Sequence, residues 1–191
     1  MFEQKKKTII VIIAPSCTGK STFIKYFKQS DNFFVKFNNY LDLDIDKTQL
    51  VSSGYIKWIR GHFKESNYTL LHFDLTSRTS CDINKLINLS LKNNIKLVLV
   101  ALYTNRKTYI KRLKKRAYIE GCWSMEAYSK WITGQERLIE LKETWNKYFN
   151  TIEDKKYAYI SKIIVYNHQN YNYNIQDFDK NIILSTLFHN I

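Results

Sequence analysis

Eight residues near the start of the chain have the types and spacing of a phosphate-binding loop. Residues 14–21 read Ala-Pro-Ser-Cys-Thr-Gly-Lys-Ser and directly follow the apolar, β-branched run Thr8–Ile13. A loop between a buried strand and the first turn of a helix directs successive backbone N–H groups and the positive end of the helix dipole toward one point, where they hold phosphate oxygens. In this pattern Lys20 reaches the β- and γ-phosphates, and the Ser21 hydroxyl is a ligand of Mg²⁺.

The residues around this loop fit the helix that the chemistry requires. Phe23, Ile24 and Phe27 fall on one face of a helix that begins near Ser21. Ala14 stands where the pattern usually has glycine, which requires that its φ angle stays negative. A chance Gly-Lys-Ser in an unrelated turn is the alternative. The predicted nucleotide contacts extend over the loop and the first helical turn: Ala14, Pro15, Ser16, Cys17, Thr18, Gly19, Lys20, Ser21 and Thr22.

An acidic residue at the end of a later strand is the second candidate for the site. Residues 68–74 read Tyr-Thr-Leu-Leu-His-Phe-Asp, a mostly apolar strand that ends in Asp74. An aspartate in this position after a phosphate-binding loop supports Mg²⁺ through the water shell of the ion. The alternative is an ordinary strand that ends in an acid. We expect His72, inside the strand, to be a packed core residue rather than a catalytic base.

The charge of the chain favours polyanionic partners. Its 191 residues, 45% of them hydrophobic, suffice for the core of one α/β domain over residues 1–191. Thirty Lys and Arg against 17 Asp and Glu leave a net charge of +13, which favours a partner such as nucleic acid. Seven of these bases fall within residues 106–116, a run without an acid.

The cysteines and the apolar runs indicate a cytoplasmic protein. Three widely spaced cysteines form no Cys-x-x-Cys pair, so neither a disulfide framework nor a zinc site is indicated, and we expect a reducing, cytoplasmic compartment. No apolar run approaches the roughly 18 to 20 residues that span a bilayer, so we expect no membrane partner.

Strands and helices alternate along the chain, which predicts a mostly parallel sheet. We expect the residues between the fifth strand and the last helix, which are rich in Asn and Tyr, to form a linker. After the first strand and helix, the patterns predict strands at 33–37, 68–74, 95–102 and 160–166, and helices at 53–64, 82–93, 105–117, 124–132, from 133 onward, and at 177–188.

This layout resembles that of the P-loop kinases, which include nucleoside and nucleotide kinases and polynucleotide 5′-hydroxyl kinases. The likeness covers roughly residues 8–170, and the loop carries its specific motif. It implies a three-layer α/β/α P-loop NTPase fold with a mostly parallel five-stranded sheet and a small helical lid at about 112–135. It also implies ATP and Mg²⁺ as cofactors. By position in the basic helix, Arg112 and Arg116 correspond to lid arginines that contact the transferred phosphate; the alternative is a solvated basic face.

A phosphoryl acceptor also needs a carboxylate that orients its hydroxyl and takes its proton. In the resembling kinases this acid often follows the second strand, where the chain has Asp42 and Asp44, which share one face when extended. One of them is the candidate base, and solvated surface is the alternative. The Asp-x-Asp-x-x-Arg pattern of polynucleotide kinases is incomplete, because Lys47 stands at the arginine position.

The sequence therefore predicts an ATP- and Mg²⁺-dependent kinase that binds a nucleoside triphosphate and acts on a nucleotide or a nucleic acid, such as DNA ends or modified bases. Two other classes stay open. One is a switch or ATPase that hydrolyses nucleotide without an acceptor, although no Asn-Lys-x-Asp motif for guanine is present. The other is a module that binds phosphate and catalyses nothing.

Overall fold

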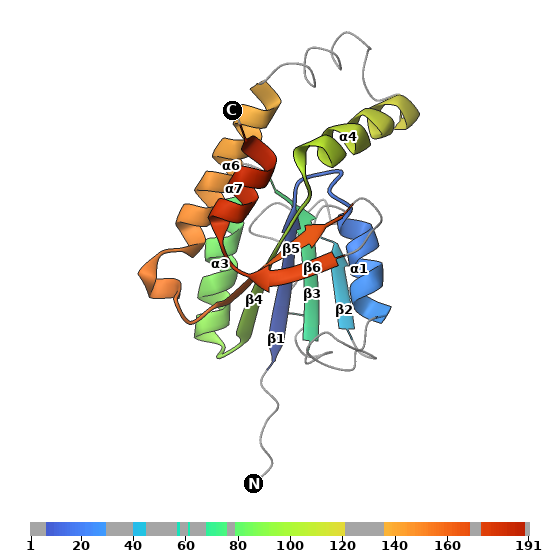
Figure 1. The fold of residues 1–191 in the computed structure, drawn as a ribbon. Helices are drawn as coiled ribbons and strands as arrows, with labels where there is room; N and C mark the ends of the chain where they lie inside the picture. The colour runs from blue at the N-terminus through green and yellow to red at the C-terminus, as the bar shows by residue number, and fades with distance from the viewer. Residues whose placement is uncertain are drawn as a thin grey trace.

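A computed structural model describes residues 7–29, 40–44, 57, 61, 68–75, 79–120, 136–168 and 173–189 (Figure 1). Strands and helices alternate over most of these residues. In chain order the elements are β1 (Thr8–Ala14), α1 (Lys20–Gln29), β2 (Tyr40–Asp44), β3 (Tyr68–Asp74), α3 (Thr79–Lys92), β4 (Lys96–Tyr103), α4 (Arg106–Glu120), α6 (Glu136–Ile152), the short 3-10 helix η2 (Lys155–Tyr157), β5 (Ser161–Asn167), β6 (Tyr173–Asp177) and α7 (Lys180–Phe188).

One sheet of six strands carries the fold, in the order β2-β3-β1-β4-β5-β6. The first five strands in that order are parallel to one another, and β6 runs antiparallel to β5. β1 lies inside the sheet between β3 and β4, and six of its seven residues are buried. The loop after β1 therefore leaves the carboxyl edge of the sheet near its centre, where parallel α/β sheets bind ligands.

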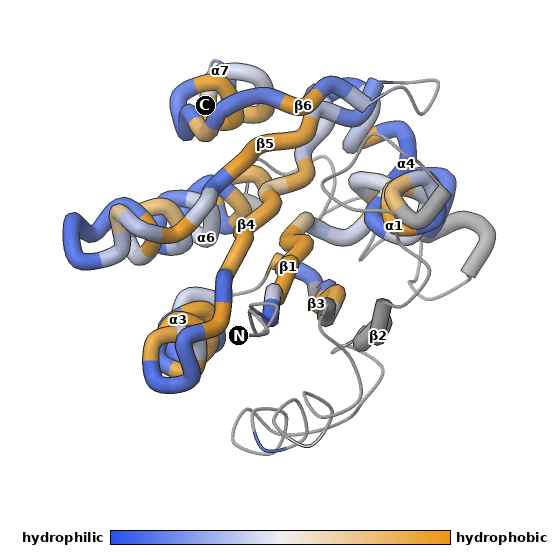
Figure 2. The backbone as a smooth tube through the Cα atoms, turned by 90° about the horizontal axis from the view of Figure 1, so that it is seen from below, coloured by the Kyte–Doolittle hydropathy of each residue, from blue (hydrophilic) through white to orange (hydrophobic). Residues whose placement is uncertain are grey.

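Helices cover both faces of the sheet, as Figure 2 shows, with α1 on one side and α3, α6 and α7 on the other. Alternate residues of β1 pack in opposite directions because side chains alternate along a strand. Ile10 and Ile12 contact the cluster that contains Phe23 and Phe27 of α1. Ile9, Val11 and Ile13 belong to the cluster on the other face. The predicted three-layer α/β/α architecture with a mostly parallel sheet is confirmed.

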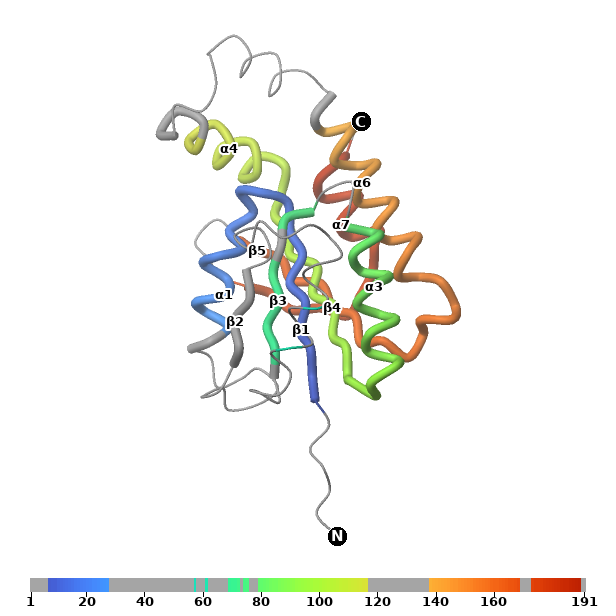
Figure 3. The backbone as a smooth tube through the Cα atoms, turned by 180° about the vertical axis from the view of Figure 1, so that it is seen from behind, coloured from blue at the N-terminus to red at the C-terminus, as the bar shows by residue number. Residues whose placement is uncertain are grey.

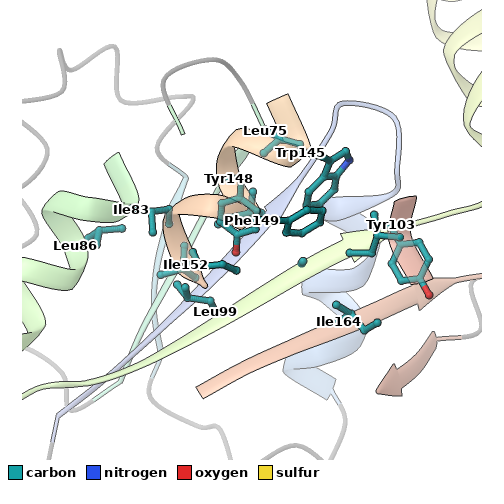
Figure 4. Packing of buried hydrophobic residues seen from close by; sticks show 14 of the residues in the cluster. Leu75, Ile83, Leu86, Leu99, Tyr103, Trp145, Tyr148, Phe149, Ile152 and Ile164 are labelled. Carbon is teal, nitrogen blue, oxygen red and sulfur yellow. The ribbon is translucent and has the colours of Figure 1, made fainter. Parts of the chain in front are cut away.

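Aromatic residues of α6 fill the larger of the two clusters (Figure 4). Trp145 and Phe149 are stacked with ring centroids 5.1 Å apart, and both are fully buried. Tyr148 lies beside them, and its burial raises the pKa of its phenol well above the usual range. Burying such rings stabilises a fold by about 2–3 kcal/mol each. α6 is thereby fixed against the sheet on the face away from α1.

The expected linker before the last helix is wrong, because residues 173–177 form the sixth strand, β6. Tyr173 packs against the core, with its ring centroid 4.9 Å from that of Phe23 and 4.8 Å from that of Tyr26. Asn174, Ile175 and Asp177 are exposed. An edge strand with one packed side chain has almost no alternation of apolar and polar residues, which is the signal by which strands are predicted.

The second strand is also different from the expectation. The predicted strand at 33–37 lies outside the described residues, and β2 occupies Tyr40–Asp44. Asp42 and Asp44 are therefore strand residues and not part of a following loop. Asp44 pairs in register with His72, near the carboxyl end of β3. The strand at 40–44 was not predicted, because its two aspartates are unusual in strands.

The remaining boundaries move by a few residues. α7 begins at Lys180 and not at 177, because the side chain of Asp179 caps it by accepting from the backbone N–H of Asn181 at 2.8 Å. α3 begins at Thr79, three residues before the prediction. The expected helices at 53–64 and 124–132 and the lid beyond Glu120 lie outside the described residues, apart from Lys57 and Gly61, which are helical.

Within the described part of the chain, every helix is too short or too polar to cross a membrane.

Candidate functional site

The loop between β1 and α1 lies beneath α4 at the carboxyl edge of the sheet (Figures 1 and 3). Its strand ends at Ala14, whose carbonyl accepts from the backbone N–H of Leu75 at 2.9 Å, so the ends of β1 and β3 are held together. Its helix begins at Lys20, and the first helical bond runs from the N–H of Phe23 to the carbonyl of Gly19 at 2.9 Å. The N–H groups of the first turn precede this bond and have no partner in the helical ladder.

The backbone of the loop has the alternating conformation that gathers N–H groups. Cys17 and Gly19 have positive φ angles of 68° and 93°. Left-handed residues that alternate with right-handed ones turn successive N–H groups into one concavity, which binds anions. Thr18 between them is fully buried, and its hydroxyl donates to the carbonyl of Pro15 at 2.7 Å. Ala14 is a strand residue without a positive φ angle, as its departure from glycine requires.

Lys20 and Asp74, predicted from separate patterns, are in direct contact. The Lys20 Nζ lies 2.5 Å from the Asp74 Oδ1, and the hydroxyl of Ser16 donates to the Asp74 Oδ2. The lysine side chain is 11% exposed and the aspartate side chain 32% exposed, so the ion pair opens to solvent on the carboxylate side. A partly buried cation and anion stabilise each other when no ligand is bound. Lys20, the Ser16 hydroxyl and the Asp74 carboxylate thus form one cluster of polar side chains.

Arg112 of α4 reaches the loop from the opposite side. Its Nη1 donates to the carbonyl of Thr18 at 2.9 Å, and its Nη2 to the carbonyl of His168 at 3.5 Å. Arg116, one turn later, places Nη1 4.0 Å from the Cys17 sulfur. Residues four apart lie on one face of a helix. Both predicted arginines therefore face the loop, and Arg112 is bound to its backbone.

Asn167, the last residue of β5, is a site residue that the sequence did not indicate. Its side chain is fully buried, and its Nδ2 donates to the carbonyl of Thr18 at 2.6 Å. A Cβ atom added to Gly19 would lie 2.5 Å from this nitrogen and 3.3 Å from the Arg112 Nη1. The loop therefore needs glycine here both for its backbone angle and for its space. An asparagine among several in residues 167–174 carries no spacing signal that could have identified it.

The other predicted residues are placed less fully. Ser21 and Thr22 are exposed in the first turn of α1. The structure describes the backbone of Asp42 and Asp44 in β2, whose carboxyl end lies at the same edge of the sheet as the loop. His72 is buried in β3, as expected for a core residue. Their predicted roles as metal ligands or catalytic base stay predictions.

The oxygen donors at the loop suit a hard cation that is coordinated mainly by water and by the phosphates of a bound substrate. No group of three or more His, Cys, Asp and Glu that could hold a metal occurs within the described residues. The candidate donors are the Ser21 hydroxyl and the Asp74 carboxylate. Mg²⁺ is bound in this manner, by one or two protein oxygens together with water and substrate phosphates. The residues present therefore fit Mg²⁺ that arrives with a nucleotide.

Comparison with known proteins bears on the fold. No protein family and no curated protein matches the chain. Among solved structures, a chain from the PezAT chromosomal toxin-antitoxin system of the human pathogen Streptococcus pneumoniae is similar. Its TM-score is 0.53 with 15% sequence identity, and the match covers 100% of this chain and 82% of that chain. At this identity the likeness concerns the fold alone, and it agrees with a P-loop NTPase-like α/β fold.

Proposed function

We propose that this chain is an ATP- and Mg²⁺-dependent phosphotransferase that acts on a nucleotide or a nucleic acid. The observation that carries the proposal is the convergence of Lys20, Asp74 and Arg112 on one loop whose backbone already forms a concavity for anions. Phosphoryl transfer asks the protein mainly for positioning and charge stabilisation. These three side chains and the loop N–H groups supply both.

Binding of a nucleotide would exchange the partner of Lys20. Its ammonium now contacts Asp74, and the oxygens of the β- and γ-phosphates would take the place of that carboxylate. Asp74 would then be available, with the Ser21 hydroxyl, to hold Mg²⁺ and its water. When bound, Mg²⁺ neutralises charge on the β- and γ-phosphates. The same carboxylate thus holds the lysine in position before the ligand arrives.

Stabilising the transferred phosphate would be the task of the arginines on α4. Arg112 and Arg116 face the loop, and their guanidinium groups supply donors that match phosphate oxygens. Asp42 or Asp44, on the edge strand β2, would accept the proton of the acceptor hydroxyl. We therefore place the acceptor over β2 and the nucleotide over β1 and α1.

A second face of α4 supports an acceptor with several phosphates. Lys107, Lys111, Lys114 and Lys115 are all exposed, and their spacing of four, three and one puts them on one side of the helix. This lysine face adjoins the arginines at the loop. A row of exposed cations beside a phosphate-binding loop matches the repeating charge of a nucleic acid backbone.

The test is transfer from γ-labelled ATP with Mg²⁺ to a panel of acceptors. The panel contains 5′-hydroxyl oligonucleotides, single- and double-stranded, modified-base DNA, nucleosides and nucleoside monophosphates, with a control that lacks an acceptor. We expect one acceptor class to be labelled. Release of inorganic phosphate in every tube would instead identify a hydrolase, and neither product in the presence of ATP binding would identify a binding module.

Lys20→Ala is the variant that links this activity to the loop. Without the ammonium, the charge on the transferred phosphate is not stabilised, and we expect the rate to fall at least about a hundredfold. Lys25→Ala is the matched control, because Lys25 lies on the same helix but is exposed. We expect that control to keep the wild-type rate. Equal rates for wild type and Lys20→Ala, with both folded, would remove the assignment.

A further inference from the structure

The carbonyl of Thr18 is held by two side chains from distant parts of the chain. Asn167 of β5 donates to it at 2.6 Å, and Arg112 of α4 donates at 2.9 Å. Thr18 and Asn167 are both fully buried. A buried carbonyl in a loop has no strand or helix ladder to satisfy it, so side chains must do so. This carbonyl, in the middle of the phosphate-binding loop, accepts hydrogen bonds from two side chains.

Holding this carbonyl also fixes the direction of the next N–H group. The peptide unit between Thr18 and Gly19 is planar and trans, so its C=O and N–H bonds point in opposite directions. With the C=O directed toward β5 and α4, the Gly19 N–H is directed away from them, to the other side of the loop. The positive φ of Gly19 continues the alternating backbone that forms the concavity.

This peptide unit is also the one most able to turn over. Rotation of a peptide plane changes the ψ angle of the residue before it and the φ angle of the residue after it. Gly19 tolerates φ angles of either sign, so it imposes little barrier to the change. If the Thr18 carbonyl lost its partners, the Gly19 N–H could point away from the phosphate in part of the population.

Asn167 is better placed than Arg112 to hold this carbonyl throughout a reaction. The backbone carbonyl of Asn167 accepts from the buried hydroxyl of Thr104 at 2.8 Å, which anchors the residue between β4 and β5. Arg112 is partly exposed and is the residue that the proposed function assigns to the transferred phosphate. When Arg112 turns to the phosphate, the Asn167 side chain is the donor that stays.

We propose that Asn167 is a positioning residue that holds the Thr18 carbonyl, so that the Gly19 N–H faces the bound phosphate and Arg112 can leave the loop. The inference rests on the proposed function only in that the loop binds phosphate. Three observations support this role of Asn167: its Nδ2 donates to the Thr18 carbonyl, its side chain is fully buried, and it occupies the space that a Cβ at Gly19 would need.

Binding of inorganic triphosphate tests this role without a base or an acceptor. We expect Asn167→Ala to weaken binding about tenfold, since one hydrogen bond in a preorganised site contributes about that much. Asn174→Ala on the adjacent strand β6 is the matched control, because Asn174 is exposed, and we expect wild-type affinity for it. Wild-type protein that binds no triphosphate would remove the proposed function instead, which separates the two failures.

An isosteric variant distinguishes a residue that positions the loop from one that only stabilises the fold. In Asn167→Asp an ionised carboxylate repels the Thr18 carbonyl, whereas the protonated acid donates to it; burial raises the pKa of the introduced carboxyl, and the guanidinium of Arg112 at the same carbonyl lowers it. We therefore expect the ratio of variant to wild-type dissociation constants to be large where the introduced carboxyl is ionised and to fall as the pH is lowered through its pKa. Because triphosphate has the same protonation state in both measurements at a given pH, taking the ratio cancels the effect of its own titration. A ratio that does not change while the introduced carboxyl titrates would overturn the role.

The Gly19 amide can be observed directly. Among the five glycines only Gly19 and Gly134 follow a threonine, so ¹³C-carbonyl threonine with ¹⁵N-glycine in a Thr133→Ser background isolates the Thr18–Gly19 pair by NMR. We expect triphosphate to shift this resonance in wild type and to leave it broadened or little shifted in Asn167→Ala. Wild-type affinity together with a wild-type shift in that variant would refute the proposal.

Discussion

Replacing Gly19 by alanine is the sharpest test of the loop geometry. Gly19 has a φ of 93°, and an added Cβ would meet the Asn167 Nδ2 at 2.5 Å and the Arg112 Nη1 at 3.3 Å. The nearer contact is shorter than any that real Cβ atoms make, so Asn167 has to move. Because Asn167 is fully buried and bonded to Thr18, moving it breaks a hydrogen bond.

The expected loss of stability has two parts. A residue with a Cβ in the left-handed region costs about 1–2 kcal/mol relative to glycine. Forcing a methyl group into a packed site costs typically about 1–3 kcal/mol, which includes the lost bond to Thr18. We therefore expect Gly19→Ala to lower the free energy of unfolding by about 2–5 kcal/mol.

Urea unfolding of matched variants measures this loss. Gly61→Ala is the control, because no atom of the described residues lies within 4 Å of a Cβ added at Gly61, which is helical and exposed. Alanine at a helical position stabilises by roughly 0.5–1 kcal/mol relative to glycine. The two substitutions should therefore change the free energy of unfolding in opposite directions.

A double-mutant cycle with Asn167→Ala separates the two parts. Truncating Asn167 makes room for the new methyl group, so in that background Gly19→Ala should cost only the conformational part, about 1–2 kcal/mol. If Gly19→Ala costs the same in both backgrounds, crowding by Asn167 is not the cause. If it costs less than about 0.5 kcal/mol in wild type, the left-handed backbone at Gly19 is refuted.

Two further predictions concern the lysine face and the core. If the acceptor is a single-stranded nucleic acid, the logarithm of its binding constant should fall with the logarithm of salt concentration. Replacing Lys111 and Lys115 by glutamine should reduce that slope by about 0.7 for each lost phosphate contact, while exposed Lys92→Gln on α3 should leave it unchanged; a salt-independent constant would exclude such an acceptor. In the core, burial and the neighbouring Tyr166 raise the pKa of Tyr103 to about 12. The unfolded chain then loses this proton near pH 10 and binds fewer protons than the native state, so the free energy of unfolding should fall from pH 10 to 12. By urea titration, Tyr103→Phe should lose about 2 kcal/mol less than wild type over that range, and an equal loss in both would contradict the burial of the phenol.

The central parts of the fold could be predicted because their signals are local. β1, the loop and α1 follow one another without a break, and β-branched residues, the Gly-Lys-Ser spacing and an apolar helical face each predict one of them. The strand β4 is a buried run of apolar residues, and β3 and β5 each have an apolar stretch at their centre. Such patterns need no knowledge of the partner elements, so the mostly parallel three-layer fold was predicted correctly.

The edges of the sheet could not be predicted in this way. β2 contains two aspartates, and β6 carries mainly exposed residues, because an edge strand pairs on one side only and buries little. Neither the β-propensity of the residues nor the alternation of apolar and polar side chains predicts such strands. The position of Asp42 and Asp44 was misjudged for this reason, since a strand was expected before them and not through them.

Asn167 marks a deeper limit of the motif. The sequence of the loop predicts that it binds phosphate, but its conformation depends on contacts from three other elements. Asp74 of β3 holds Lys20, Arg112 of α4 and Asn167 of β5 hold the Thr18 carbonyl, and the strand order puts β3 and β5 on opposite sides of β1. A peptide next to glycine keeps one orientation only when such contacts fix it. The eight-residue motif therefore supplies the N–H groups, and residues 54 to 149 positions away determine where they point.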